Sequence, residues 1–244
     1  MVNLRLWFAN EELPQHYHQG HSSLHEALIQ RHFNLVRSLL DVNADLSQED
    51  ELGDPPIHFA SADGLDEVVE ELVVARADVN AGNAQGFTPL MVASQEGHYA
   101  VARTFCLTLL ADVRKTTPAP DRLTALAMAA VDSGSEKIVN LLLTCMANAN
   151  DQYGEASSVL IEVVANGHVE MVTTLCESRA DVNRGNPSGV SPLHMAAQHA
   201  SLACTRYLLL QGATVNQTSS EGKTALHYAA ADEPSEQVVA VLLA

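Results

Sequence analysis

The sequence is short of lysine and strongly acidic, and this imbalance excludes several classes of partner. Lys115, Lys137 and Lys223 are its three lysines, and 13 basic residues stand against 30 acidic ones, so the formal net charge is −17. Such a chain repels nucleic-acid phosphates and anionic membrane surfaces and favours basic protein partners. No run of about 18 apolar residues occurs, so no segment is expected to insert into a membrane.

Paired cysteines and aromatic residues are also scarce. The four cysteines form no CxxC pair, and their places in helical segments suit small apolar fillers in a reducing compartment: Cys106, Cys145, Cys176 and Cys204. Aromatic residues make up only 5% of the chain, which suits packing between thin layers better than one thick core. The apolar start is too short for a secretory signal, so an intracellular, cytoplasmic protein is expected.

What the sequence does contain is one short motif that occurs seven times, with a period close to 33 residues. Its copies begin near residues 22, 55, 88, 124, 158, 191 and 224, and the last copy is incomplete. Typical copies read Thr88-Pro-Leu-Met91 and Ser191-Pro-Leu-His194. A fixed period of this size indicates a solenoid, in which each unit buries its apolar face only against its neighbours.

Each unit has the same internal order. Thr or Ser can cap a helix, and Pro suits the first helical position. A small pair such as Ala129-Ala130 follows, then a turn, then a second helix with apolar spacing. Polar, glycine-rich links such as 81–86 have β-turn chemistry.

These features resemble the ankyrin-repeat family, whose period, two-helix unit and T-P-L-H-x-A signature match this pattern. The resemblance implies an all-α solenoid of helix-turn-helix units joined by β-hairpin-like loops, over residues 22–244. Residues 1–21 are expected to be an N-terminal cap or extension. The family's glycine after the second helix survives only as Gly212. The other copies have Asn43, Arg76, Leu110, Met146 and Arg179, and positive φ there would cost about 1 kcal/mol each, which predicts rearranged or less stable helix ends.

The spacing also shows where residues have been added. The 36-residue step from Thr88 to Thr124 has extra residues around Leu109-Leu110 and 116–120. The fourth and seventh units each have one added residue in the turn between their helices, at 131–134 and 232–235.

The histidines are the first candidates for chemistry. The resemblance assigns His25, His58, His194 and His227 to hydrogen bonds between repeats. His16, His18 and His21 could gather a transition metal, but a linker explains them as well, and no metal or other cofactor is predicted. No nucleophile, base and orienting group come together, and no phosphate-binding glycine loop occurs, so no enzyme activity is expected. The resemblance also makes Asn80 and Asn183 possible hydroxylation sites.

The predicted partner surface is the concave face, formed in this family by the first helices and the hairpin tips. Five apolar residues occur two positions after the motif leucine: Phe59, Val92, Met128, Met195 and Tyr228. They could form a recognition strip or merely shield the helix layer. Two charged links flank them. Glu49, Asp50 and Glu51 could steer a basic partner, whereas Arg114, Lys115 and Arg122 could hold an acidic segment or a neighbouring repeat.

The sequence therefore predicts a non-catalytic module that binds another protein, one with a basic segment, through its concave face and hairpin tips. Two alternatives stay open: the recruiting arm of a longer enzyme, and a structural spacer or self-associating scaffold. A monomer is expected unless the apolar C-terminal helix, which has no polar cap, pairs with another copy.

Overall fold

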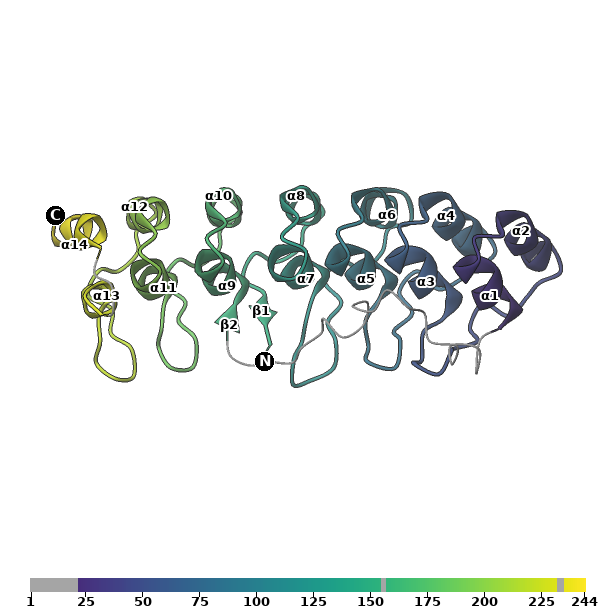
Figure 1. The fold of residues 1–244 in the computed structure, drawn as a ribbon, viewed down its shortest axis with the longest axis horizontal. Helices are drawn as coiled ribbons and strands as arrows, with labels where there is room; N and C mark the ends of the chain where they lie inside the picture. Colours follow the sequence, from purple (N-terminus) through teal and green to yellow (C-terminus); the bar gives the residue numbers. More distant parts are fainter. Residues whose placement is uncertain (1–21, 155–156, 232–234) are drawn as a thin grey trace.

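The computed structural model describes residues 22–154, 157–231 and 235–244, which form two parallel layers of short helices with loops along one edge (Figure 1). The first helices of the units form one layer: α1 (Ser23–Ile29), α3 (Pro56–Ala62), α5 (Pro89–Gln95), α7 (Ala125–Val131), α9 (Val159–Ala165), α11 (Pro192–Gln198) and α13 (Ala225–Ala229). The second helices form the other: α2 (Phe33–Asp41), α4 (Asp66–Val74), α6 (Tyr99–Arg103) with η2 (Thr104–Thr108), α8 (Glu136–Thr144), α10 (Val169–Glu177), α12 (Leu202–Leu210) and α14 (Glu236–Leu243). This confirms the all-α solenoid.

The first helices begin where the capping pattern places them. Their N-cap residues are Ser22, Pro55, Thr88, Thr124, Ser158, Ser191 and Thr224. The hydroxyl of Thr88, for example, accepts the backbone N–H of Met91. Pro89 follows in the first helical turn, where a backbone N–H would have no partner within the helix. Pro55 differs from the others because it has neither a hydroxyl group nor an N–H.

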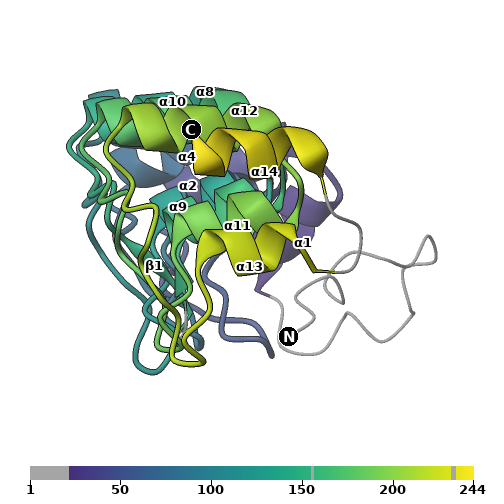
Figure 2. The same ribbon diagram turned by 90° about the vertical axis from the view of Figure 1, so that its left-hand side faces the viewer.

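Small residues let the two layers approach closely. Ala60, Ala93, Ala129 and Ala196 have no exposed surface, and each lies in a first helix. From the second layer, side chains such as Val69 and Leu72 of α4 fill the space between the helices. Figure 2 shows the two helix layers viewed along the stack. Each unit packs on the next one, so the buried side chains form one thin continuous core between the layers.

The loops between units are hairpin-like, and three of them are closed by a polar side chain five residues before the cap. Asn83 accepts the N–H groups of Gln85 and Phe87 through its side-chain oxygen, and Asp50 and Asn186 repeat this arrangement. Before α9 this position is Tyr153, and here a short antiparallel pair forms instead, between β1 (Gln152–Tyr153) and β2 (Ser157–Ser158).

The added residues are absorbed at three places that leave the helix caps in register. In the third unit, one residue widens the second helix into the π-helical turn η2, and Ala111 N–H reaches back to the Phe105 carbonyl. Two more lengthen the following hairpin. In the fourth unit, the second-helix cap Ser135 follows Thr124 by eleven residues, whereas Leu65 follows Pro55 by ten. The predicted sites of these insertions are therefore correct, although 232–234 lie outside the described residues.

The residues that replace glycine after the second helices keep the left-handed conformation. Their φ angles are 57° at Asn43, 77° at Arg76, 53° at Leu110, 70° at Met146 and 68° at Arg179, against 87° at Gly212. The helix end itself is regular at Arg76, because Ala77 N–H bonds to Leu72 O and Arg76 N–H to Val73 O. The expected rearrangement therefore occurs at Leu110, where the π-helical turn η2 precedes it, and not at Asn43, Arg76, Met146 or Arg179.

Several sequence expectations concern residues that the structure does not describe or describes differently. The cap assigned to 1–21 and the histidines at 16, 18 and 21 lie outside the described residues. Cys106 and Cys204 are buried, but Cys145 and Cys176 are only partly so. Within the described part of the chain, no helix is long and apolar enough to cross a membrane.

We predict that Arg76→Gly stabilises the protein by about 0.5–1 kcal/mol, because glycine adopts a positive φ without steric cost. Arg76 is exposed, so little else is lost. The measurement is the urea midpoint of unfolding. Arg76→Ala is the control: it removes the same side chain but keeps the unfavourable conformation. Equal midpoints for the two variants would show that backbone strain at this helix end is negligible.

Candidate functional site

Histidine rings join consecutive first helices. The Nε2 atoms of His25, His58 and His194 lie 3.0, 2.8 and 3.1 Å from the carbonyl oxygens of Asp54, Phe87 and Lys223, each the residue directly before the cap of the next first helix. The role that the resemblance assigns to these three rings is thus present. His227 is exposed, and its Nδ1 accepts the N–H of its own cap, Thr224.

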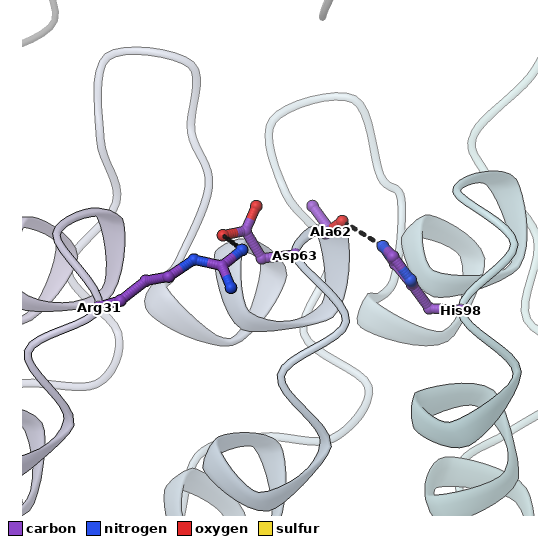
Figure 3. Close-up of polar contacts among 4 residues, drawn as sticks. All are labelled: Arg31, Ala62, Asp63 and His98. Carbon is purple, nitrogen blue, oxygen red and sulfur yellow. Dashed lines mark hydrogen bonds and ion pairs between the residues drawn. The ribbon is translucent and has the colours of Figure 1, made fainter.

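A second set of contacts joins the turns between the helices. His98 caps α6 and its Nε2 lies 2.7 Å from Ala62 O in the preceding unit, while Arg31 forms a 3.3 Å ion pair with Asp63 (Figure 3). Both contacts leave one unit and end on the adjacent one. His98 therefore contributes to the contact between two stacked units.

His58 differs from its counterparts in one atom. In the first, sixth and seventh units the cap N–H donates to the histidine Nδ1, at 3.0–3.2 Å from Ser22, Ser191 or Thr224. Pro55 has no N–H, and Nδ1 of the buried His58 has no partner. Burial lowers the pKa of His58 to about 4, so the ring is neutral and this nitrogen is an unused acceptor.

We predict that Pro55→Thr stabilises the protein by about 1 kcal/mol, because it adds a capping hydroxyl and a donor for His58 Nδ1. The lost rigidity of proline offsets part of this gain. Thermal unfolding would measure it. Pro55→Ala, which restores only the N–H, should fall between the two. A threonine variant that melts below the parent protein would contradict this account.

Asparagine side chains form a ladder along the hairpins. Asn80, Asn150 and Asn183 each lie four residues after a left-handed helix end, and each Oδ1 accepts a backbone N–H of the next unit, from Asp112, Asp181 and Thr214. We call these contacts the asparagine ladder. Asn80 and Asn183, predicted as possible hydroxylation sites, thus have a structural role, and their hydroxylation stays a prediction.

The basic link also contacts its neighbours. Lys115 Nζ lies 2.5 Å from Asn80 O in the preceding unit, a position that Arg184 and Gln217 fill in later units. Arg114 Nε donates to Met146 O in the following unit at 2.9 Å. Of the two roles considered for this link, contact with neighbouring repeats is observed for both residues. Arg122 is exposed.

Four of the five residues of the predicted strip are partly exposed on the first-helix layer. Phe59, Val92, Met195 and Tyr228 are half-buried at equivalent positions of α3, α5, α11 and α13. Two also support the layer: Phe59 packs edge-on against the His25 ring and Tyr228 against the His194 ring, with centroids 5.1 Å apart in both pairs. Phe59 and Tyr228 therefore cover the histidine rings of the helix layer and still expose part of their own surface.

Met128 does not belong to this strip, so the prediction for this residue is wrong. Its side chain is 0% exposed. The strand β1 packs against α7, and the Tyr153 hydroxyl donates to Asp132 at the end of that helix at 2.6 Å. Met128 therefore belongs to the core of a region that this hairpin covers. Sequence reasoning missed Tyr153, although an aromatic residue where other hairpins carry Asp or Asn was a visible signal.

The acidic link combines exposed and engaged carboxylates. Glu49 and Glu51 are exposed, whereas Asp50 accepts two backbone N–H groups of its own hairpin. Asp54 is only 3% exposed and accepts the side-chain N–H of Asn83 at 2.7 Å. Burial raises the pKa of Asp54 to about 6; the Asn83 hydrogen bond opposes this rise, and the charges of Asp50 and Glu49 add to it.

This shift predicts a stability that falls as the pH rises. The unfolded carboxyl ionises near pH 4 and the folded one near pH 6, so the folded state holds the extra proton between these values. Asp54→Asn removes the charge and can still accept from Asn83. It should stabilise the protein by about 2 kcal/mol at pH 7 and far less at pH 4. Urea unfolding at both pH values is the measurement; a pH-independent difference would contradict the assignment.

Among the described residues, no group of three or more His, Cys, Asp or Glu side chains could hold a metal ion. The stacked helix pairs, hairpin loops and ring-to-carbonyl contacts define a class, the helical repeat solenoid. A family model of ankyrin repeats, three copies long, matches the chain in overlapping windows at 24–117, 57–153, 105–186, 126–219 and 160–244. The chain belongs to the ankyrin-repeat family.

Known proteins of this family are similar along the chain. The crystal structure of the ankyrin-repeat domain of Bcl-3, a member of the IkappaB protein family, superposes with a TM-score of 0.81 at 27% identity, covering 93% of this chain and 100% of that one. The human ASB11 ankyrin-repeat domain has a TM-score of 0.75 at 24% identity, covering 91% and 97%.

The curated relatives are similar over shorter stretches. A probable E3 ubiquitin-protein ligase, XBOS33, from Oryza sativa subsp. japonica is 38% identical over 81 residues, 33% of this chain and 16% of that protein. The nuclear factor NF-kappa-B p105 subunit from Gallus gallus is 33% identical over 110 residues, 43% of this chain and 11% of that protein. The chain thus matches less than a fifth of the length of either relative.

Proposed function

We propose that this chain is a protein-protein interaction module, with no catalytic activity of its own, that binds the basic segment of a partner across its concave face. The concave face means the exposed side of the first helices together with the hairpins. Ankyrin-repeat domains generally bind other proteins, and the similarity to Bcl-3 extends over nearly the whole chain. A cytoplasmic, monomeric protein is consistent with this proposal.

The observation that carries the proposal is the half-exposed strip at Phe59, Val92, Met195 and Tyr228. Apolar and aromatic side chains at one repeated position offer a partner a contact area that is already accessible in the folded protein. Met195 adds an adaptable side chain. These residues lie in two pairs, on α3 and α5 and on α11 and α13, on either side of the part covered by Tyr153.

Charge supports a basic partner. Glu26 and Glu162 occupy the strip position in α1 and α9, and Glu96 and Asp132 follow the ends of α5 and α7. Carboxylates at helix C-termini oppose the helix dipole, so they weaken the isolated fold and would gain from a cationic ligand. Burial raises the pKa of both Glu96 and Asp132, in keeping with this environment. Exposed Glu49 and Glu51 would increase the association rate.

A second candidate function is that of a recruiting arm in a longer enzyme. The similarity to a probable E3 ubiquitin-protein ligase, of which this chain matches 16%, favours it. A third, a spacer or self-associating scaffold, would use the apolar helix α14. Both are compatible with partner binding on the concave face, and the full reading frame and the solution mass distinguish them.

We predict that peptides selected from a random library on this protein are rich in Lys and Arg and bind the concave face. Val92→Lys with Met195→Lys should weaken them about ten-fold or more, because the change removes apolar contact and adds like charge. The affinities can be measured by fluorescence anisotropy.

The matched control is Val74→Lys with Leu210→Lys, which adds the same charge on the exposed surface of α4 and α12. Its effect should be small and should disappear at high salt. Equal losses from the two double variants would show that net charge alone governs binding and that the concave face is the wrong surface.

A further inference from the structure

The ladder position is not an asparagine in two units: it is Ser47 in the first unit, before the ladder begins, and Arg114 in the third unit, inside the ladder. Asn80, Asn150 and Asn183 stand at the ladder position of the second, fourth and fifth units, and Arg114 stands there in the third. An asparagine side chain offers both a donor and an acceptor, whereas a guanidinium group offers donors only. The substitution therefore removes one half of a ladder contact and keeps the other.

Arg114 keeps the donor half of the ladder contact. Arg114 Nε donates to Met146 O at 2.9 Å, just as Asn150 Nδ2 donates to Arg179 O and Asn183 Nδ2 donates to Gly212 O, both at 3.2 Å. The cationic side chain thus occupies the place of the asparagine amide nitrogen.

The half that is lost leaves a donor without an acceptor. Asp112, Asp181 and Thr214 each donate their backbone N–H to a ladder oxygen. The equivalent N–H in the fourth unit is that of Asn148, two residues after the left-handed Met146. Within the described part of the chain no protein acceptor lies within hydrogen-bond distance of this exposed N–H, because residue 114 has no side-chain oxygen. The equivalent N–H of Asp78, which follows Ser47 at the ladder position, has none either.

A cavity of about 740 Å³ adjoins this interruption, and its lining includes Arg114, Met146, Asn148, Asp151, Glu177 and Arg179. Neither Arg114 nor Arg179 has a carboxylate within ion-pair distance among the described residues, although the chain has a net charge of −17. Glu177 and Asp151 are the opposing charges of the lining. Hydrogen bonds from Thr124 and Asn148 and the nearby charges of Arg114 and Arg184 already act on Asp151, although neither arginine lies within ion-pair distance of it.

We propose that this cavity binds a carboxylate group, that of an Asp or Glu side chain on a partner protein. One carboxylate oxygen accepts the Asn148 N–H, in place of the missing asparagine oxygen, and the other accepts a remaining N–H of Arg114. Planar carboxylates suit guanidinium donors, and charge-assisted hydrogen bonds of this type are the stronger ones. The site lies at the hairpin edge and is independent of the strip on the concave face.

The test is an NMR titration of the intact chain with sodium acetate at pH 7, at constant ionic strength. The Asn148 backbone amide and the Arg114 Nε–H signals should shift in a saturable manner. Sodium chloride over the same range should not move them. Arg114→Asn restores the ladder residue and removes the cation, so it should abolish the acetate shift and raise the unfolding temperature.

Arg122→Asn is the matched control: it removes the same charge from the same insert, at a φ of 47° that asparagine tolerates. This variant should bind acetate as the parent protein does, while Arg114→Asn binds about ten-fold more weakly or not at all. Equal shifts with chloride, or an acetate shift that persists in Arg114→Asn, would overturn the proposal. Saturation by inorganic phosphate but not by acetate would overturn the choice of a carboxylate.

Discussion

The hydrogen bonds between consecutive units set the constraint on which this structure depends. A pair of short helices cannot bury its own apolar face, and its helix ends and hairpin leave backbone groups without partners. His58 reaches Phe87 O, Asn183 reaches Thr214 N–H, and His98 reaches back to Ala62 O. Each such contact needs the adjacent unit at a fixed position. The placement of one unit on the next is therefore more constant than the number of residues in a unit.

This constraint explains where the chain tolerates added residues. The third unit places one in the π-helical turn η2 and two in its hairpin, and the fourth adds one to the turn before α8. Thr124 and Ser158 still cap their helices in the same way as Thr88 does. The insertions are absorbed by a widened helical turn, a hairpin and a turn between helices, and Phe105 of the widened turn is itself buried, so the core between the layers is continuous across the irregular units.

Much of this could be predicted from the sequence, because cap residues and small pairs depend mainly on local chemistry. Helix starts such as Thr88-Pro89 and the histidine contacts are examples. The burial of Met128 was not predicted, because the strand β1, whose Tyr153 lies 25 positions further along and donates to Asp132, packs against the helix that carries it. The conformation of the helix ends at Arg76 and Met146 could not be predicted either. A positive φ costs each of these residues about 1 kcal/mol, and contacts between stacked units, which local propensity does not include, outweigh this cost.

The departures from the repeat pattern are where the chain gains features of its own. Tyr153 covers the middle of the concave face, so its exposed apolar residues fall into two pairs, and a partner in the proposed mode would bridge them across the acidic centre at Asp132 and Glu162. Arg114 interrupts the asparagine ladder and leaves the Asn148 N–H without an acceptor beside an unpaired cation. In a solenoid, the polar groups at regular positions are already hydrogen-bonded to the adjacent unit. A polar group that has no partner in the adjacent unit is available to a ligand. The irregular third and fourth units thus carry the features that distinguish this chain from a regular repeat array.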